Sequence, residues 1–128
     1  MNLNRAELIG NLAADPVATR LKSGGEIVSF TVVTSRTVQT GSGEKRKDVQ
    51  FHDVSAFGQL GRVVVKYLKK GDRVYVDGHL VNDHWYGNDG TKHTRAGIVA
   101  QNLIMLGGGK REKTNDEVIV EEIDPANV

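Results

Sequence analysis

The middle of the chain changes its hydrophobic pattern twice over residues 49–78, which read VQFHDVSAFGQLGRVVVKYLKKGDRVYVDG. The two ends of this segment alternate apolar and polar residues, as half-buried strands do. Between them, apolar residues recur at the spacing of one buried helix face: Leu60, Val63, Val64, Tyr67 and Leu68. Lysines at 69 and 70 suit a last helical turn, and Gly71 suits the cap that follows. The segment predicts a strand, a helix over about residues 59–69, and a second strand.

Strands are predicted on both sides of this segment. β-branched and aromatic residues recur, with Gly, Asn and Asp between the runs, over residues 3–12, 27–38, 49–57, 72–86 and 91–106. Three strands, a helix and two long strands are the element order of an OB-fold. The predicted fold is therefore all-β, a five-stranded Greek-key barrel with one helix between strands 3 and 4. A sandwich fits less well, because five strands and a helix are enough to close a small barrel.

The chain of 128 residues has room for one such domain and a short extension. We expect the OB-fold domain to cover residues 1–108. Residues 109–128 are predicted to be a flexible, disordered acidic tail, because they hold too little apolar surface to fold unaided. Residues 112–128 carry six acids and one base, and residues 1–111 carry 10 acids and 16 bases. A basic body indicates a polyanionic partner, although a polarised solvated surface has the same composition.

Several functional classes have no support in the sequence. There is no cysteine to ligate zinc or act as a nucleophile, and the four histidines do not have the spacing of a zinc motif. The glycines match neither a P-loop nor a dinucleotide fingerprint, and no pair of carboxylates can be assigned to acid–base work. We expect no enzyme activity, no metal and no cofactor. The absence of a membrane span or signal peptide predicts a cytoplasmic protein.

Aromatic side chains are expected on polar strand faces. Phe51 and Phe57 share one side of their strand with Asp53, while the apolar Val54 takes the other side. Trp85 falls on the charged face of the next strand. Rings kept among charges indicate a platform on which nucleic-acid bases stack. Two alternatives stay open: the rings pack in an interface or under a loop, or a β-bulge changes the alternation.

Basic side chains surround these aromatics in the predicted fold. A single lysine is usually just solvated, so they are informative only together with the rings. We expect six of them to hold phosphates, with binding that weakens as salt rises: Arg5, Arg36, Lys47, Lys70, Arg73 and Arg95. His52 shares the face of Val54, so we interpret it as packed or interfacial.

Taken together, these segments resemble bacterial single-stranded DNA-binding proteins over residues 1–110. The matching stretches, in order, are LIGNL at 8–12 with Asp15-Pro16, FH at 51–52, AFG at 56–58, YLKKG at 67–71, VYVDG at 74–78, Trp85, and NLIML at 102–106. Each stretch is weak alone, but their order and spacing are specific.

The resemblance implies an OB-fold that assembles as a homotetramer and binds single-stranded DNA in replication, recombination and repair, and it therefore implies a nucleoid-associated protein. The family's stacking aromatics fall on Phe51, Phe57 and Trp85, which are the residues that strand alternation selects. His52 matches a position associated with subunit contacts.

The sequence departs from the family pattern in three places. Val38 stands where a further stacking aromatic is common. Residues that are often basic in relatives are here Asp53, Gln59, Asp83 and His84, which implies weaker binding per subunit. The acidic tail, which would contact replication and repair proteins and compete with DNA for the basic face, lacks the family's apolar tip with a terminal Phe. Recruitment of partners through the tail is therefore in doubt.

A second function from another class remains open. An OB-fold accessory subunit, such as a primosome-like relative, would use the same face mainly for a protein partner. A Trp85→Ala change separates the two, because only the first function requires the ring for DNA affinity.

Overall fold

A computed structural model describes residues 1–108 and 118–119 of the chain. Its elements, in chain order, are β1 (Ala6–Leu12), β2 (Val17–Arg20), β3 (Glu26–Gln39), β4 (Lys45–Phe57), α1 (Gly58–Tyr67), β5 (Asp72–Tyr86), β6 (Lys92–Gly108) and β7 (Val118–Ile119). The predicted strands and helix are all present, and most of their ends differ from the prediction by one to three residues.

Five of the strands close a barrel. Strand β1 pairs with β5 on one side and with β3 on the other, and the path between them runs through β6 and β4. All of these pairings are antiparallel except that of β4 with β6, where Val54 lies opposite Ile98. The predicted OB-fold, with α1 between the third and fourth barrel strands, is confirmed. The short β2 is paired with β3 outside the closed ring.

The core is built from alternate residues of the barrel strands and from one face of α1. Val32, Val54, Val76 and Leu103 are fully or almost fully buried, each from a different strand. The helix adds Leu60 and Val64 at the base of the barrel, and Leu68 directly after it joins the same core. Burying a side chain of this size is worth about 1.5–3 kcal/mol. The sequence pattern that predicted the helix therefore reports its real packing face.

The prediction that Tyr67 belongs to this buried helical face is wrong. Tyr67 is half exposed, and the ammonium of Lys66 lies 5.2 Å from the centre of its ring. The helix ends at Tyr67, two residues earlier than predicted, because Leu68 already has an extended backbone with φ −96°. Leu68 turns into the core while its N–H still donates to the carbonyl of Val64 at 2.9 Å.

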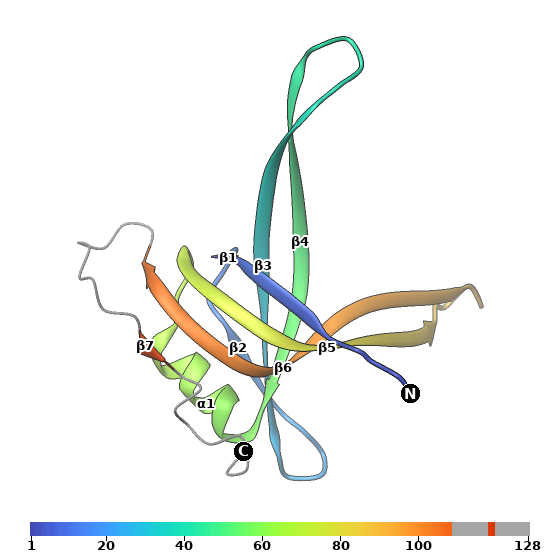
Figure 1. Ribbon diagram of the computed structural model, residues 1–128. Helices are drawn as coiled ribbons and strands as arrows, with labels where there is room; N and C mark the ends of the chain where they lie inside the picture. The colour runs from blue at the N-terminus through green and yellow to red at the C-terminus, as the bar shows by residue number, and fades with distance from the viewer. Residues whose placement is uncertain (109–117, 120–128) are drawn as a thin grey trace.

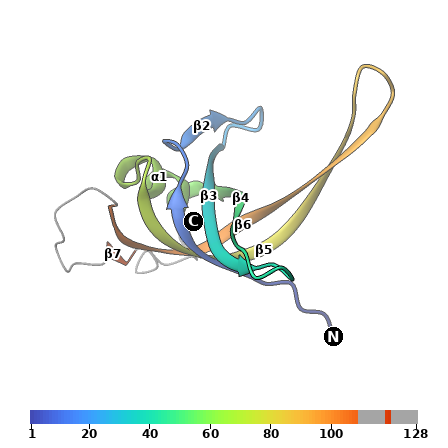
Figure 2. The same cartoon turned by 90° about the horizontal axis from the view of Figure 1, so that it is seen from above.

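Two long hairpins project from the barrel in different directions (Figure 1). One is formed by β3 and β4, and the other by β5 and β6; seen from above, the second reaches furthest from the helix (Figure 2). Strand β4 begins four residues earlier than predicted, because Lys45–Lys47 pair with residues 37–39 of β3 rather than ending a loop. The basic triplet is thus part of an ordered hairpin.

The β5–β6 hairpin leaves the barrel at a β-bulge beside Gly78. A Cβ atom at this position would lie 2.0 Å from the carbonyl oxygen of Val99 on the paired strand. Only glycine allows the two backbones to approach so closely.

The predicted tail falls mostly outside the described residues. Of residues 109–128, only β7 is described, and it pairs with Ile104 and Met105 of β6. The domain boundary at residue 108 therefore stays a prediction. Within the described part of the chain, no helix has the length and apolar character needed to cross a membrane.

Candidate nucleic-acid interface

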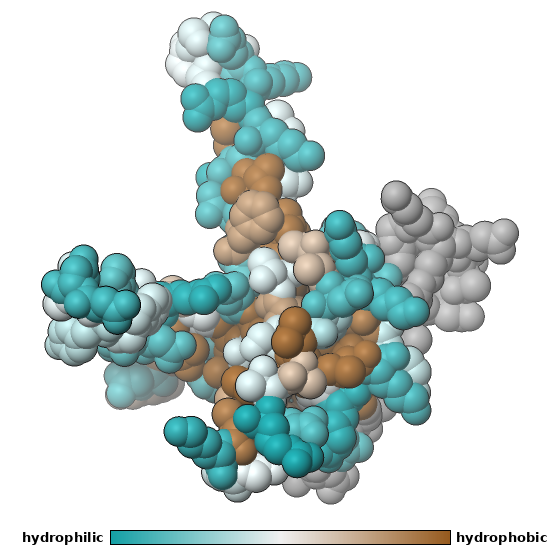
Figure 3. Space-filling model, turned by 180° about the vertical axis from the view of Figure 1, so that it is seen from behind, coloured by the Kyte–Doolittle hydropathy of each residue, from teal (hydrophilic) through white to brown (hydrophobic). Residues whose placement is uncertain are grey.

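One face of the β3–β4 ladder carries the two phenylalanines. The register is continuous, with Val33 opposite Phe51 and Ile27 opposite Phe57. Because side chains alternate along a strand, both rings point away from the core that holds Val54. Phe51 is 67% exposed and Phe57 is 40% exposed. In the space-filling view, apolar side chains gather towards the root of this hairpin and its tip is hydrophilic (Figure 3).

A groove runs between this ladder and the β5–β6 hairpin. Its volume is about 490 Å³, and it is lined from both sides by a mixture of polar and apolar side chains, including Ser29, Thr31, Asp53, Ser55, Val81 and Arg95. Asp53 and Ser55 lie between Phe51 and Phe57 on the same face of β4. The groove therefore opens between two exposed rings.

Trp85 lies further along the opposite wall. Val81, Asp83 and Trp85 alternate along β5, so they share the hairpin face that borders the groove. The Trp85 ring is stacked on that of His93 across the hairpin, with 5.5 Å between centroids and 22° between planes. One side of the indole is covered in this way, and the side chain is still 47% exposed. Tyr86, the next residue, points to the other face of the hairpin.

Three of the arginines expected to bind phosphates are in ion pairs. Within the groove, Arg95 Nε donates to Asp53 Oδ2 at 2.7 Å. On the other face of the β3–β4 hairpin from Phe51, Arg36 Nε donates to Asp48 Oδ2 at 3.2 Å. Hydrogen bonds from Gln50 and then Arg36 lower the pKa of Asp48.

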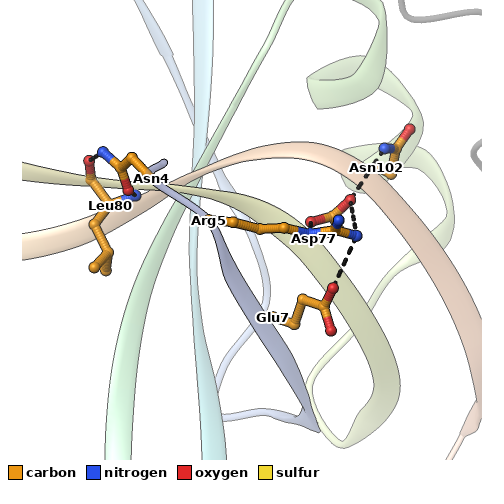
Figure 4. Close-up of polar contacts among 6 residues, drawn as sticks. All are labelled: Asn4, Arg5, Glu7, Asp77, Leu80 and Asn102. Carbon is orange, nitrogen blue, oxygen red and sulfur yellow. Dashed lines mark hydrogen bonds and ion pairs between the residues drawn. The ribbon is translucent and has the colours of Figure 1, made fainter. Parts of the chain in front are cut away.

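The third arginine, Arg5, lies beside the root of the β5–β6 hairpin (Figure 4). Its Nε is 3.0 Å from Asp77 Oδ1 and its terminal nitrogen is 2.8 Å from Glu7 Oε1. The charge of Asp77, followed by that of Glu7, raises the pKa of Arg5. Its neighbour Asn4 exchanges two hydrogen bonds with the backbone of Leu80, at 2.8 and 2.9 Å. The segment before β1 is thereby fixed against the hairpin.

The other predicted cations are spread around the barrel. Lys47 lies on the Phe51 face of the β3–β4 hairpin, opposite Thr37. Lys70 follows α1, and its backbone N–H donates to Asp15 at 2.8 Å. Arg73 is on the outer face of β5, where it donates to the side chain of Asn11 at 3.2 Å. The structure therefore brings Lys47 and Arg95 near the aromatic face and leaves Arg5, Arg36, Lys70 and Arg73 beside other surfaces.

His52 lies on the other side of β4 from the phenylalanines, as its position in the sequence predicts. It is half buried, and its Nε2 is 2.8 Å from Thr34 Oγ1. Among residues 1–108 and 118–119 there is no cluster of three or more His, Asp or Glu side chains suited to a metal ion.

Comparison with known proteins agrees with this architecture. Residues 3–106 match the model of the single-strand binding protein family. The chain belongs to this family. It is 34% identical over 108 residues to a single-stranded DNA-binding protein of Neisseria meningitidis, which covers 84% of the chain. It is 36% identical over 115 residues to single-stranded DNA-binding protein 1 of Xylella fastidiosa, with 89% of the chain and 83% of the relative covered.

The chain spans 62% of the length of its Neisseria relative. Among solved structures, it is similar to Plasmodium falciparum SSB in complex with single-stranded DNA, with a TM-score of 0.77, 28% identity, and 83% and 96% of the two chains covered. A deletion mutant of the Thermus aquaticus single-stranded DNA-binding protein has the same fold, with a TM-score of 0.71 at 22% identity, over 91% of this chain and 54% of that one.

Two features of the face were not predicted from the sequence. The first is His93 as the stacking partner of Trp85, which a hairpin register counted from the turn at Gly87–Gly90 would have found. The second is the Asp53–Arg95 pair, which joins residues 42 positions apart and has no local signal.

Proposed function

We propose that this protein binds single-stranded DNA with little sequence preference, by stacking bases on Phe51, Phe57 and Trp85. The observation that carries the proposal is the exposure of three rings on the strand faces that border the groove, Phe51 and Phe57 on β4 and Trp85 on the opposite wall in β5. Every base has a π-surface, so a ring platform tolerates all sequences, whereas readout of base edges needs specific hydrogen bonds. The solved complex of a family member with single-stranded DNA supports the same ligand class.

Phosphates are the second part of the proposal. Lys47 and Arg95 share strand faces with the rings, and DNA that continues around the barrel would pass the remaining cations: Arg5, Arg36, Lys70 and Arg73. Three of the six are ion-paired within the chain, so each must exchange a carboxylate for a phosphate. We therefore expect base stacking to contribute more of the affinity than these cations do.

The biological context follows from family membership. We propose a non-enzymatic role in protecting single strands during replication, recombination and repair, with the protein acting as a homotetramer in the cytoplasm. His52 is the proposed subunit contact, since it lies half buried beside Thr34 on the face opposite the rings.

The test compares two neighbouring aromatic residues of β5. Trp85→Ala should reduce affinity for a fluorescein-labelled oligo-dT, measured by anisotropy, by about 1–3 kcal/mol, or roughly five- to 150-fold. Tyr86→Ala is the matched control, because Tyr86 is 72% exposed but on the other face of the hairpin.

An unchanged affinity in Trp85→Ala would contradict the stacking mechanism. It would favour the alternative in which this face binds a protein partner. Equal losses in both variants would show that the hairpin matters through its shape rather than through the Trp85 ring.

A further inference from the structure

We propose that Asp53 limits the DNA affinity of the groove by holding Arg95, so that DNA must displace this carboxylate before Arg95 binds a phosphate. The inference rests on the proposed function and concerns one determinant within it. It identifies an acidic residue as a determinant, beside the rings, of how tightly this groove binds DNA.

The contacts of Asp53 show how the arginine is held. Its Oδ2 accepts from Arg95 Nε at 2.7 Å, and its Oδ1 accepts from Thr31 Oγ1 at 3.4 Å. A second guanidinium nitrogen of Arg95 also contacts Oδ2. Because Thr31 lies opposite Asp53 in the β3–β4 ladder, the carboxylate is oriented from the barrel side towards the hairpin. The pair thus links β6 to β4 across the groove.

The pair lies where DNA would enter. Asp53 is between Phe51 and Phe57 on β4, and both members of the pair line the groove. Their side chains are 39% and 61% exposed, so a phosphate can reach Arg95 without any change in the barrel. An ion pair this exposed contributes little to stability, and its partner can be exchanged.

The charge of Asp53 weakens the attraction between the groove and a DNA phosphate. While Asp53 neutralises Arg95, an incoming phosphate gains no net attraction from the guanidinium. It also meets a second carboxylate in the groove lining, that of Asp83, which lies opposite Arg95 in the β5–β6 ladder. Removing the charge of Asp53 leaves Arg95 available, and each phosphate neutralised on a single strand contributes about −0.7 to the salt slope.

The same chemistry occurs outside the groove and provides a control. Arg36 and Asp48 form an ion pair with exposures of 76% and 32%, on the hairpin face opposite Phe51. Neutralising Asp48 changes the net charge as much as neutralising Asp53 does. Only neutralising Asp53 frees a cation in the groove between the rings.

The experiment measures oligo-dT affinity of the full chain by anisotropy across a salt series. Asp53→Asn keeps an oxygen that can accept from Thr31, and we expect it to bind about three- to tenfold more tightly at low salt, with a slope steeper by about 0.7. Asp48→Asn frees Arg36 on the hairpin face away from the rings, and its gain in affinity should be smaller than that of Asp53→Asn. The gain should disappear in Asp53→Asn combined with Arg95→Gln, because the two residues act as a unit.

Three results would overturn the inference: no gain in Asp53→Asn, an equal gain in Asp48→Asn, or a gain that persists without Arg95. Thermal melting confirms that each variant is folded, and Asp53→Ser replaces Asp53→Asn if the latter is not. If the unmodified protein fails to bind oligo-dT at all, the proposed function itself is wrong. Binding by the unmodified protein with no Asp53 effect rejects only this inference.

Discussion

The two hairpins that leave the barrel are built alike but carry different chemistry. Residues 35–50 of the β3–β4 hairpin hold four basic and two acidic side chains, whereas residues 80–97 of the β5–β6 hairpin hold two of each. The first presents Phe51 at its root and the basic triplet nearer its tip. The second presents Trp85 stacked on His93, and the next pair of residues on the same face places Asp83 opposite Arg95 in the strand register.

The two hairpins therefore combine positive charge and exposed aromatic rings in different proportions. On the β3–β4 hairpin, the basic triplet and the exposed Phe51 ring lie on one hairpin, so we expect phosphate attraction and stacking to act together there. On the β5–β6 hairpin, Arg95 is held by Asp53 and the Trp85 ring is partly covered by His93, so we expect stacking to act there with little net charge. We therefore expect the affinity for single-stranded DNA to depend on salt concentration at the β3–β4 hairpin and much less at the β5–β6 hairpin.

The largest expected effect comes from a substitution at the bulge where the β5–β6 hairpin leaves the barrel. Gly78→Ala places a Cβ against the Val99 carbonyl and should destabilise the fold by about 3 kcal/mol or more, because a backbone oxygen cannot easily move aside. Chemical denaturation measures the change. Gly97→Ala is the control: its Cβ would meet atoms at 3.5 and 3.8 Å, an ordinary contact distance, and should cost less than about 1 kcal/mol. Similar losses in both variants would mean that the bulge does not require glycine.

A second prediction compares the rings of the two hairpins. Phe51→Ala should lower oligo-dT affinity by about 1–3 kcal/mol, as for Trp85→Ala, and the double variant should lose the sum of the two. Additivity is expected because the rings lie on different elements and do not contact each other. If the double variant loses no more than either single one, the two rings act as one coupled unit rather than as independent stacking sites.

The smallest expected effect concerns charge on the first hairpin. Lys47→Gln should make the salt slope of oligo-dT binding shallower by about 0.7, with a loss of affinity of a few fold at low salt. Lys92→Gln on the second hairpin is the control, because Lys92 lies opposite Tyr86 on the face away from Trp85. Isothermal titration at several salt concentrations gives both slopes. A larger change of the salt slope in Lys92→Gln than in Lys47→Gln would show that the β5–β6 hairpin, and not the β3–β4 hairpin, supplies the salt-dependent phosphate contacts.

The fold was predictable because each of its signals is local. Alternation placed Val54 inside and Phe51 outside, and a helical repeat found Leu60 and Val64. The main errors occur where a local pattern ends: Tyr67 is exposed because the helix stops there, and β4 extends to Lys45 because cross-strand pairing with β3 continues past the apolar residues.

The site was less predictable, since its electrostatics depend on contacts between distant residues. The sequence selected Arg5, Arg36 and Arg95 as candidate phosphate-binding cations. It gave no sign that Asp77, Asp48 and Asp53 respectively would pair with them, because these partners are brought close only by strand register. Exposure of the three rings followed from alternation, whereas the groove between them follows from how two hairpins leave the barrel.

The most direct test of base stacking uses the intrinsic fluorescence of Trp85, which is the only tryptophan in the chain. Titration with oligo-dT should quench its emission, and quenching should saturate at the same ratio of DNA to protein as an independent anisotropy measurement. Saturated binding with unchanged tryptophan emission would show that no base reaches this ring, and would contradict the proposed face.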